Sequence, residues 1–327
     1  MSGNKSAAGL DSTGGQRGAP GKVLCLVGPT GAGKTEAALA LAEAFRGSVV
    51  NFDSRQVYRV VPVTTAQPSP EEQARCPHLL YGFMPCSQAV SAGSFAEMAA
   101  KAVHAVLEQG RTPILVGGTG LYLQALLEGL APIPDVPRDV RERVASQWDE
   151  QGGDVLHARL AEADPAYAAR VHPNDRQRVT RALEVLEATG RTFSAWHALA
   201  EKPLDLPCLK MGIRMEKAAL DRRLAARIHA MLEQGALEEV RRAVAETPDP
   251  SAPGLSGIGC AELTAHLRGE LGFQEALDLW LSNTKAYAKR QMTWFKRDTS
   301  IHWFGPGKTR EMVALASGWL NLRPISG

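Results

Sequence analysis

The sequence predicts an α/β fold, with a doubly wound parallel sheet as its core and an all-helical insertion between two parts of that core. Three observations support this prediction. Between residues 22 and 127, short apolar segments alternate with helical patterns. The first apolar segment is joined to the first helix by a glycine-rich loop, GPTGAGKT. From residue 138 to about residue 202, by contrast, only helical patterns occur.

The composition is that of a soluble globular enzyme. The chain has 327 residues, 44% apolar and 22% charged, which is enough for one large or two modest domains. Its net charge of +2 neither requires nor excludes a nucleic-acid partner. The five cysteines are irregularly spaced without a CxxC pair, which indicates reduced thiols in the cytoplasm and argues against a zinc site. No apolar run reaches membrane-spanning length, no signal peptide is recognisable, and residues 1–21 are expected to be a disordered tail.

The glycine-rich loop at residues 28–35 fits the phosphate-loop pattern GxxxxGK(S/T). Residues 22–27 before it are nearly all apolar without alternation, as in a strand buried on both faces, and residues 36–45 after it are rich in helix formers. This context predicts a P-loop NTPase-like core. The Lys34 ammonium is suited to phosphate oxygens and the Thr35 hydroxyl to Mg²⁺. We expect a phosphate or diphosphate to bind at Gly28, Pro29, Thr30, Gly31, Ala32, Gly33, Lys34 and Thr35.

A second strand is predicted at Ser48–Phe52, directly before Asp53. The connection from the first strand is one helix long, so the two strands should be parallel, with Asp53 on the same edge as the phosphate loop. Ligands bind at this edge in open α/β sheets. The Asp53 carboxylate has three interpretations: a Mg²⁺ ligand, a general base that accepts a proton from an amine or hydroxyl, or a cap at the strand end. Its position favours the first two.

An edge strand and a helix are expected next. Residues 78–83, HLLYGF, are the candidate edge strand. The helix spans residues 94–109, with Ser94 and Glu97 forming a capping box at its start and Gly110 ending it.

A third buried strand is predicted at residues 113–116, followed by Gly117, Gly118, Thr119 and Gly120 and a short helix at 121–127. Thr119 should therefore lie on the same edge as Asp53. Its hydroxyl either assists the reaction, as a donor to an oxyanion or by orienting the acceptor, or caps the following helix.

A domain boundary is indicated at residues 129–137, which contain three prolines. The predicted organisation is a tail at 1–21, a first core part at 22–137, a helical insertion at 138–203 and the completion of the core at 204–327. Helices are expected in the insertion at 139–151, 155–162, 165–171 and 175–189, and a strand returns at 209–213.

A long helix near the C-terminus, residues 274–297, carries the clearest local charge signal. Its basic residues, with no acid from residue 279 onward, are Lys285, Lys289, Arg290, Lys296 and Arg297. This favours an anionic partner on that face. Trp280, Tyr287 and Trp294 repeat every seven residues on roughly the opposite face, and we interpret them as an aromatic core stripe.

Two further basic clusters occur. The first lies in the insertion and consists of Arg170, Arg176, Arg178 and Arg181, against Asp175. The second contains Arg222, Arg223 and Arg227, against Asp221. Arg223 and Arg227 are four residues apart on one helix face, where they either clamp a diphosphate or remain solvated.

Taken together and in order, the motifs resemble those of the bacterial tRNA dimethylallyltransferase (tRNA isopentenyltransferase) family. The matching segments are GPTGAGKT from Gly28, DSRQVYR from Asp53, TAQPS from Thr65, LVGGTGLYLQALLEGL from Leu115, HPNDRQRVTRALEV from His172, GIGCAEL from Gly257 and AKRQMTWFKRD from Ala288. They span nearly the whole chain after the tail, and the ordered set is far more specific than the phosphate loop alone.

The resemblance implies a reaction and its partners. A dimethylallyl group passes from dimethylallyl diphosphate to the exocyclic N6 amine of the adenosine 3′ to the anticodon of a tRNA, and diphosphate leaves. The phosphate loop would hold the prenyl diphosphate, with Thr35 on Mg²⁺ and with Arg227 and Arg223 as further diphosphate contacts. Asp53 would be the general base and Thr119 the threonine beside the reacting atoms. We expect a cytoplasmic monomer without membrane contact.

The resemblance also implies where tRNA binds. The helical insertion would grip the anticodon stem-loop, and the C-terminal helix would add basic residues near the RNA. The implied tRNA contacts are Asp53, Ser54, Arg55, Gln56, Thr119, Arg141, Gln177, Arg178, Val179, Thr180, Arg181, Gly257, Ile258, Gly259, Lys289 and Arg290.

The sequence departs from the family pattern at two places. Gln67 stands where the family usually has lysine, and Cys260 and Ala261 stand where it usually has tyrosine and a basic residue. Three other functions remain as alternatives. A small-molecule kinase would use ATP on the same loop, an adenylate isopentenyltransferase would prenylate a free nucleotide, and a non-catalytic protein would only bind RNA.

Overall fold

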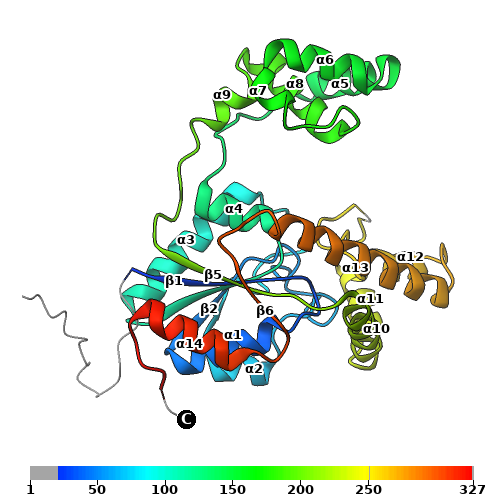
Figure 1. The fold of residues 1–327 in the computed structure, drawn as a ribbon. Coiled ribbons are helices and arrows are strands. Elements are labelled where there is room, and N and C mark those ends of the chain that lie inside the picture. Colours follow the sequence, from blue (N-terminus) through cyan, green and yellow to red (C-terminus); the bar gives the residue numbers. More distant parts are fainter. Residues whose placement is uncertain (1–20, 250, 326–327) are drawn as a thin grey trace, which may run out of the picture. The chain divides into compact units, whose positions relative to one another are not determined.

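A computed structural model describes residues 21–249 and 251–325, so the predicted tail at residues 1–20 lies outside the described residues. The chain divides into two compact units (Figure 1). One unit combines the residues up to Leu126 with those from Leu204 onward, and the other comprises Leu127–Pro203. We refer to them as the core unit and the helical unit.

The core unit is built on a parallel sheet with the strand order β3-β2-β4-β1-β5-β6. The strands are β1 (Val23–Val27), β2 (Gly47–Asn51), β3 (His78–Leu79), β4 (Thr112–Val116), β5 (Cys208–Ile213) and β6 (His302–Phe304). Every residue of β1, β2 and β4 is buried, which explains why β1 is apolar without alternation and why β2 and β4 are also rich in apolar residues. The predicted parallel α/β sheet is confirmed, with β3 at its edge.

The order of the strands locates the binding edge. Strand β4 lies between β1 and β2, although it follows both of them in the sequence. Strand β5 pairs with the other side of β1. The connections therefore reverse direction beside β1, and the carboxyl end of a strand at such a point opens a crevice between loops. The phosphate loop follows β1 directly.

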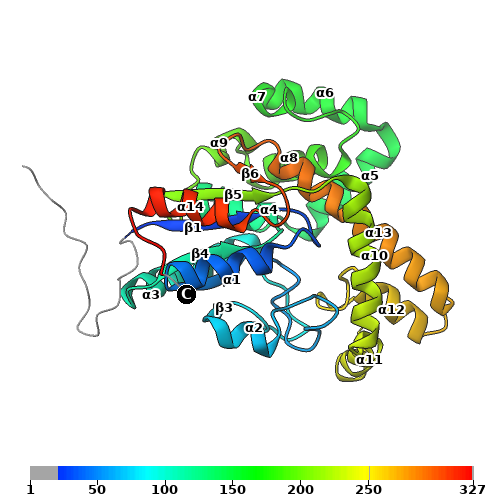
Figure 2. The same ribbon diagram turned by 60° about the horizontal axis from the view of Figure 1, so that its bottom comes forward.

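Helices cover both faces of this sheet. Outside α5 to α9, the helices are α1 (Lys34–Ala44), α2 (Pro70–Arg75), α3 (Ala92–Glu108), α4 (Gly120–Glu128), α10 (Lys217–Glu233), α11 (Ala236–Glu246), α12 (Cys260–Leu267), α13 (Phe273–Phe295) and α14 (Thr309–Leu320). Figure 1 shows α1 and α14 on one face and α3 and α4 on the other. Both ribbon views show α10 to α13 gathered at one end of the sheet (Figures 1 and 2). Leu39 of α1, Ile114 of β4 and Met312 of α14 meet in the main core.

The start of α3 differs from the prediction. The helix begins at Ala92, and its N-cap is Ser91, whose side chain accepts a hydrogen bond from the Ser94 amide at 3.1 Å. The capping box expected at Ser94 and Glu97 is therefore wrong. Ser91 and Ser94 are both good caps, and the outcome depends on which backbone is extended; here it is Ser91, with φ −69° and ψ 156°.

The helical unit has its own apolar core. It contains α5 (Arg138–Gln151), α6 (Gly153–Ala163), α7 (Pro165–Ala168), α8 (Arg176–Thr189) and α9 (Phe193–His197), of which α9 is not among the predicted helices. Val144, Leu156, Leu160 and Leu183 are fully buried between these helices. The unit begins at Leu127, earlier than residue 138, because Ile133 and Val136 of the proline-containing segment pack on this core. No helix in the described part of the chain is long and apolar enough to cross a membrane.

Candidate active site

The phosphate loop leaves β1 through a turn that requires glycine. Gly28 has φ 145°, and a Cβ at this position would lie 2.6 Å from the carbonyl oxygen of Ile213 on the neighbouring strand β5. Gly33, with φ 98°, directly precedes α1. Helix α1 starts at Lys34, so its first amides have no carbonyl partner within the helix and are available to an anion.

Lys34 is held by its own loop. Its Nζ atom donates to the carbonyl oxygens of Gly28 at 2.9 Å and Pro29 at 3.0 Å. Burial lowers the pKa of Lys34 to about 8; the Asp53 carboxylate opposes this shift and the Arg227 guanidinium adds to it. The ammonium is thus poised to exchange carbonyl oxygens for those of an anion.

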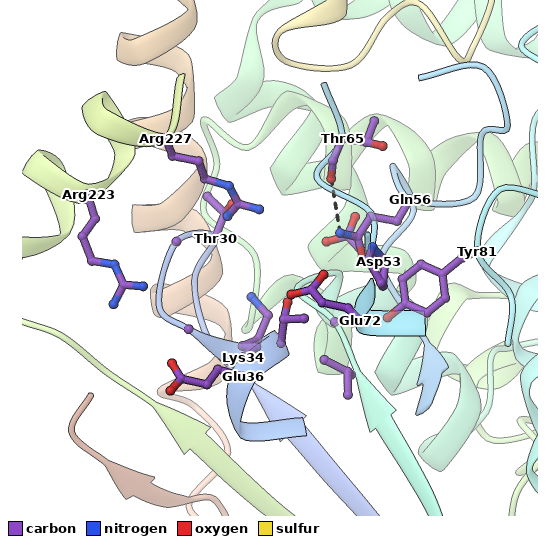
Figure 3. Close-up of a pocket in the computed structure, with 16 residues that line it drawn as sticks. Thr30, Lys34, Glu36, Asp53, Gln56, Thr65, Glu72, Tyr81, Arg223 and Arg227 are labelled. Carbon is purple, nitrogen blue, oxygen red and sulfur yellow. Dashed lines mark hydrogen bonds between the residues drawn. The ribbon is translucent and has the colours of Figure 1, made fainter. Parts of the chain in front are cut away.

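A cavity of about 340 Å³ opens beside this loop (Figure 3). Its lining residues are Thr30, Gly31, Gly33, Lys34, Thr35, Glu36, Asp53, Gln56, Thr65, Pro68, Glu72, Tyr81, Val116, Gly117, Arg223 and Arg227. Figure 3 shows Arg223 and Arg227 reaching from α10 toward the loop. Of the two readings of this arginine pair, the structure favours the clamp, because both side chains line the cavity that contains Lys34. We call this space the phosphate cavity.

A second cavity of about 280 Å³ has a mainly apolar wall. Leu224, Ile228 and Met231 of α10 lie on one side, and Trp280 and Tyr287 of α13 contribute aromatic rings. The two cavities share the lining residues Thr30, Asp53, Thr65 and Arg227. A carboxylate and a guanidinium therefore lie where the polar space meets this apolar cavity.

Asp53 is held in place by a buried neighbour, Asn51. The Asn51 side chain accepts from the Asp53 amide at 2.7 Å and donates to the Asp53 carbonyl at 3.1 Å and to the Leu80 carbonyl at 2.9 Å. One carboxylate oxygen of Asp53 accepts from the Arg55 amide at 2.9 Å. The sequence analysis did not single out Asn51, which is fully buried. The signal that could have identified it is an amide side chain within a segment predicted to be a buried strand, because a buried amide needs hydrogen-bond partners.

Thr119 connects the loop after β4 to the loop after β2. Its hydroxyl oxygen accepts from the Ser54 amide at 2.9 Å and donates to the Ser54 hydroxyl at 3.2 Å. Asp53 and Ser54 line the cavities, whereas Thr119 is absent from the described lining residues. The structure therefore gives Thr119 a positioning contact with the turn that carries Asp53, and its contact with reacting atoms stays a prediction.

Tyr287 brings a neutral phenol to the apolar cavity. Burial raises its pKa, and the nearby Asp53 carboxylate raises it further, while hydrogen bonding to Thr119 opposes the shift. The ring of Tyr287 is also contacted by the Arg290 guanidinium, 5.8 Å from its centroid. The phenol thus remains a hydrogen-bond donor at neutral pH.

Two of the expected tRNA contacts brace loops of the core unit. Arg55 donates to the carbonyls of Pro253 at 2.9 Å and Gly254 at 3.0 Å. Gln56 donates to the carbonyls of Thr65 at 3.2 Å and Ala66 at 2.6 Å. These bonds connect the segment after Asp53 to both loops that border the apolar cavity.

The segment at 257–259 lies beside this bracing. Gly257 is buried against the Arg55 guanidinium, where a Cβ would collide with it, and Ile258 lines the apolar cavity. Gly259 has φ 92° and precedes α12. Contact of these three residues with RNA stays a prediction.

The residues that depart from the family pattern have structural contacts. Gln67 donates to the Tyr58 carbonyl at 2.7 Å and to the Thr65 hydroxyl at 3.2 Å, so it shapes the same loop as Gln56. Cys260 is fully buried at the start of α12. Neither side chain requires a ligand to satisfy it.

In the helical unit, exposure separates the expected tRNA contacts into two groups. Arg141, Gln177 and Arg178 are exposed, and Arg181 is partly exposed. Val179 and Thr180 are buried in the core of the unit, and the Thr180 hydroxyl donates to the Arg176 carbonyl at 2.8 Å. Contact of Val179 and Thr180 with RNA stays a prediction, and their burial gives it no support.

The positive charge of the basic cluster in the helical unit is balanced by more carboxylates than the local sequence indicates. Arg176 pairs with Asp149 at 2.7 Å, and Arg178 pairs with Asp175 at 2.7 Å. Arg181 lies 3.3 Å from Glu184. Asp149 comes from α5, so the fold supplies a carboxylate that the local sequence around α8 does not contain.

The prediction of an aromatic core stripe on α13 is only partly correct. Trp280 is buried and Tyr287 lines the apolar cavity, but Trp294 is 36% exposed. A seven-residue spacing drifts by only about 20° per repeat, so the three rings share one side of the helix although their exposure differs. Lys289 and Arg290 are exposed, as the basic face predicts.

The chain is similar to known proteins over most of its length. The profile of the IPP transferase family matches residues 56–298. The chain is 51% identical over 298 residues to the tRNA dimethylallyltransferase of Maridesulfovibrio salexigens, covering 91% of this chain and 97% of that protein. It is 56% identical over 284 residues to the tRNA dimethylallyltransferase of Nitratidesulfovibrio vulgaris, covering 87% and 92%.

Solved structures of similar proteins share the fold of this chain. The tRNA isopentenylpyrophosphate transferase of Bacillus halodurans superposes with a TM-score of 0.69 at 31% identity, over 92% of this chain and 97% of that one. A eukaryotic dimethylallyltransferase acting on tRNA gives a TM-score of 0.74 at 25% identity, over 93% and 81%.

Proposed function

This chain belongs to the IPP transferase family, and on that premise we propose which part of the prenyl-transfer reaction takes place in each of its two cavities. The chain transfers a dimethylallyl group to tRNA, the activity for which relatives identical to it at half or more of the aligned residues are named. The donor is dimethylallyl diphosphate, and the acceptor is the exocyclic N6 amine of the adenosine 3′ to the anticodon. The observation that carries this assignment is the meeting of a cavity lined by Lys34 and two arginines with an apolar cavity, at Asp53 and Arg227.

The phosphate cavity holds the diphosphate. Lys34, Arg223 and Arg227 place three cations around one space, together with the first amides of α1. Negative charge accumulates on the diphosphate as its bond to the allylic carbon breaks, so cations fixed beforehand lower the barrier to departure. They do so at little reorganisation cost, because Lys34 and Arg227 are already positioned before the donor arrives.

Mg²⁺ fits the same cavity. The Thr35 hydroxyl and the carboxylates of Glu36 and Glu72 line it, and oxygen donors of this kind are the ones that this ion prefers. Within residues 21–249 and 251–325, no group of three or more acidic, histidine or cysteine side chains could hold a metal alone. Thr35 would therefore share the ion with diphosphate oxygens, whose charge the ion neutralises when bound.

The apolar cavity receives the five-carbon group and the adenine. Its aliphatic wall from α10 suits the allyl chain, and Trp280 and Tyr287 offer aromatic surface to a base that leaves the anticodon-loop stack. The amine nitrogen forms a bond to the allylic carbon while the carbon–oxygen bond breaks. Asp53 accepts the proton that the amine loses, and the diphosphate carries away the electron pair of the broken bond.

The helical unit grips the anticodon stem-loop through exposed residues such as Arg141, Gln177 and Arg178. We expect the enzyme to act as a monomer. Its place is the cytoplasm, where unmodified tRNA is available.

A labelled-donor assay tests this function. Purified protein, labelled dimethylallyl diphosphate and Mg²⁺ are incubated in parallel with unmodified tRNA and with AMP. We expect label on the tRNA, at the adenosine 3′ to the anticodon. Label on AMP alone would instead identify an adenylate isopentenyltransferase.

Asp53→Asn, measured in the same assay, tests the base. The amide keeps the size of the side chain but cannot accept the proton, and removal of a general base typically costs about 100-fold to 10,000-fold in rate. Binding of tRNA should persist. Turnover equal to that of the wild type would remove Asp53 as the base.

A further inference from the structure

A buried side chain on α13 connects the two loops that form the reaction site. Gln291 is only 4% exposed. Its Oε1 atom accepts from the amide of Thr30 in the phosphate loop at 2.9 Å, and its Nε2 atom donates to the carbonyl of Gly118 in the loop after β4 at 2.9 Å. The orientation of this carboxamide is unambiguous, because a backbone amide can only donate and a carbonyl can only accept.

The residues around Gln291 leave just enough space for its side chain. Gly118 has no side chain, and a Cβ there would collide with Gln291 Nε2 and approach Asp53 Oδ2 to 3.4 Å. Thr119, the next residue, bonds to Ser54 beside Asp53. A continuous series of hydrogen bonds thus joins the phosphate loop, through Gln291 and the loop after β4, to the turn that carries Asp53.

Gln291 does not itself line either cavity among the described lining residues. Both ends of its carboxamide are occupied by backbone, so it is not poised to hold a substrate. An apolar residue would serve helix packing equally well at a buried position, whereas only a side chain with both a donor and an acceptor can hold these two loops together.

We propose that Gln291 is a positioning residue, which fixes the spacing between the diphosphate in the phosphate loop and the amine at Asp53 so that the two reacting bonds are aligned. The proposal rests on the assignment of the donor diphosphate to the phosphate cavity. Prenyl transfer joins two separately bound substrates, and their alignment depends on how firmly these loops are held. A displacement of about 1 Å can cost on the order of 100-fold in rate.

The test compares Gln291→Met with the wild type. Methionine has a similar length and volume but neither hydrogen bond, so the Thr30 amide and the Gly118 carbonyl lose their partner. We expect kcat to fall by about 10-fold to 100-fold while the KM for tRNA changes by less than about threefold. Gln274→Met, at an exposed position of the same helix, is the matched control and should leave kcat unchanged.

Gln291→Glu adds a readout that a purely structural role would not produce. The ionised carboxylate repels the Gly118 carbonyl, whereas the protonated acid donates to that carbonyl and accepts from the Thr30 amide. Burial raises the pKa of such a carboxyl group. The ratio of variant to wild-type kcat should therefore rise as the pH falls from about 8 to about 6. Taking the ratio removes the pH effects that are common to both proteins.

Binding of inorganic diphosphate, followed by calorimetry, separates the two hypotheses. Wild-type protein that binds no diphosphate would contradict the donor site itself. Wild-type binding together with a folded Gln291→Met variant of normal kcat would overturn the positioning role. If Gln291→Met does not fold, a pH-independent ratio for Gln291→Glu overturns it instead.

Discussion

Lys34 illustrates how the surroundings of one residue set its chemistry. On an exposed surface a lysine is charged at every physiological pH, but burial beside the phosphate loop lowers the pKa of Lys34 to about 8. The charge is retained near neutrality because Asp53 opposes the effect of burial. The same environment raises the pKa of Tyr81 on the cavity wall, so that phenol stays neutral.

We expect the affinity for diphosphate to depend on pH through Lys34. A bound anion favours the ammonium, so binding raises the pKa of Lys34 above its value in the free protein. The contribution of Lys34 to the affinity should be constant below pH about 8 and should then fall by up to about tenfold per pH unit as free Lys34 loses its proton. Calorimetry with inorganic diphosphate from pH 6 to about pH 9.5 measures this profile.

Lys34→Arg is the control for this profile, since arginine stays charged throughout. The variant shares any titration of the ligand, so the difference between the two profiles isolates Lys34. Parallel profiles would show that Lys34 does not carry the binding charge.

At the scale of an element, α13 combines several surfaces on one helix. Trp280 and Tyr287 face the apolar cavity, and Gln291 is buried between two loops. Lys289 and Arg290, only one or two positions away from Gln291, are exposed. A helix turns by 100° per residue, so neighbours in sequence can serve a substrate cavity and a polyanion surface at once.

Charge reversal at Lys289 and Arg290, to glutamate at both, should weaken tRNA binding. Each cation that contacts a phosphate contributes about one unit to the slope of log affinity against log salt, so the slope should decrease by about two. Filter binding with unmodified tRNA at several salt concentrations gives this slope. Diphosphate affinity should be unaltered, since neither residue lines the phosphate cavity.

The matched control is the same double reversal at Arg241 and Arg242, which are exposed on α11. It changes the net charge by the same amount at another surface. Equal salt slopes for the wild type and the α13 variant would contradict a role of this helix in RNA binding.

At the scale of the whole molecule, the chain contains two units with separate cores. The core unit contains every lining residue of both cavities, and the helical unit contains Arg141 and the exposed residues of α8. Donor binding and anticodon binding should therefore be separable by destabilising one unit.

Leu183→Ala tests this division. Leu183 is fully buried in the helical unit, and loss of such a side chain costs about 2–5 kcal/mol of folding free energy. We expect a lower denaturation midpoint for part of the unfolding transition, weaker tRNA binding and unchanged diphosphate affinity. Leu199→Ala, at a position that is 45% exposed in the same unit, should change none of these. Loss of diphosphate binding in Leu183→Ala would show that the two units do not function independently.

The sequence by itself determined the features that depend on neighbouring residues. The strand, the phosphate loop and the first helix are contiguous, so the positions of Lys34 and Thr35 followed from local pattern alone. The placement of Asp53 followed as well, because a crossover of one helix makes two strands parallel and brings their carboxyl ends together. The family resemblance rested on such contiguous motifs and was confirmed.

Only the tertiary structure decided the contacts between distant segments. It placed Arg223 and Arg227 beside a loop about two hundred residues earlier, paired Arg176 with Asp149, and exposed Trp294. It also placed Gln291 between Thr30 and Gly118. A neutral amide carries no charge pattern or periodicity in sequence, and its hydrogen bonds exist only once folding has brought both loops within 3 Å of it.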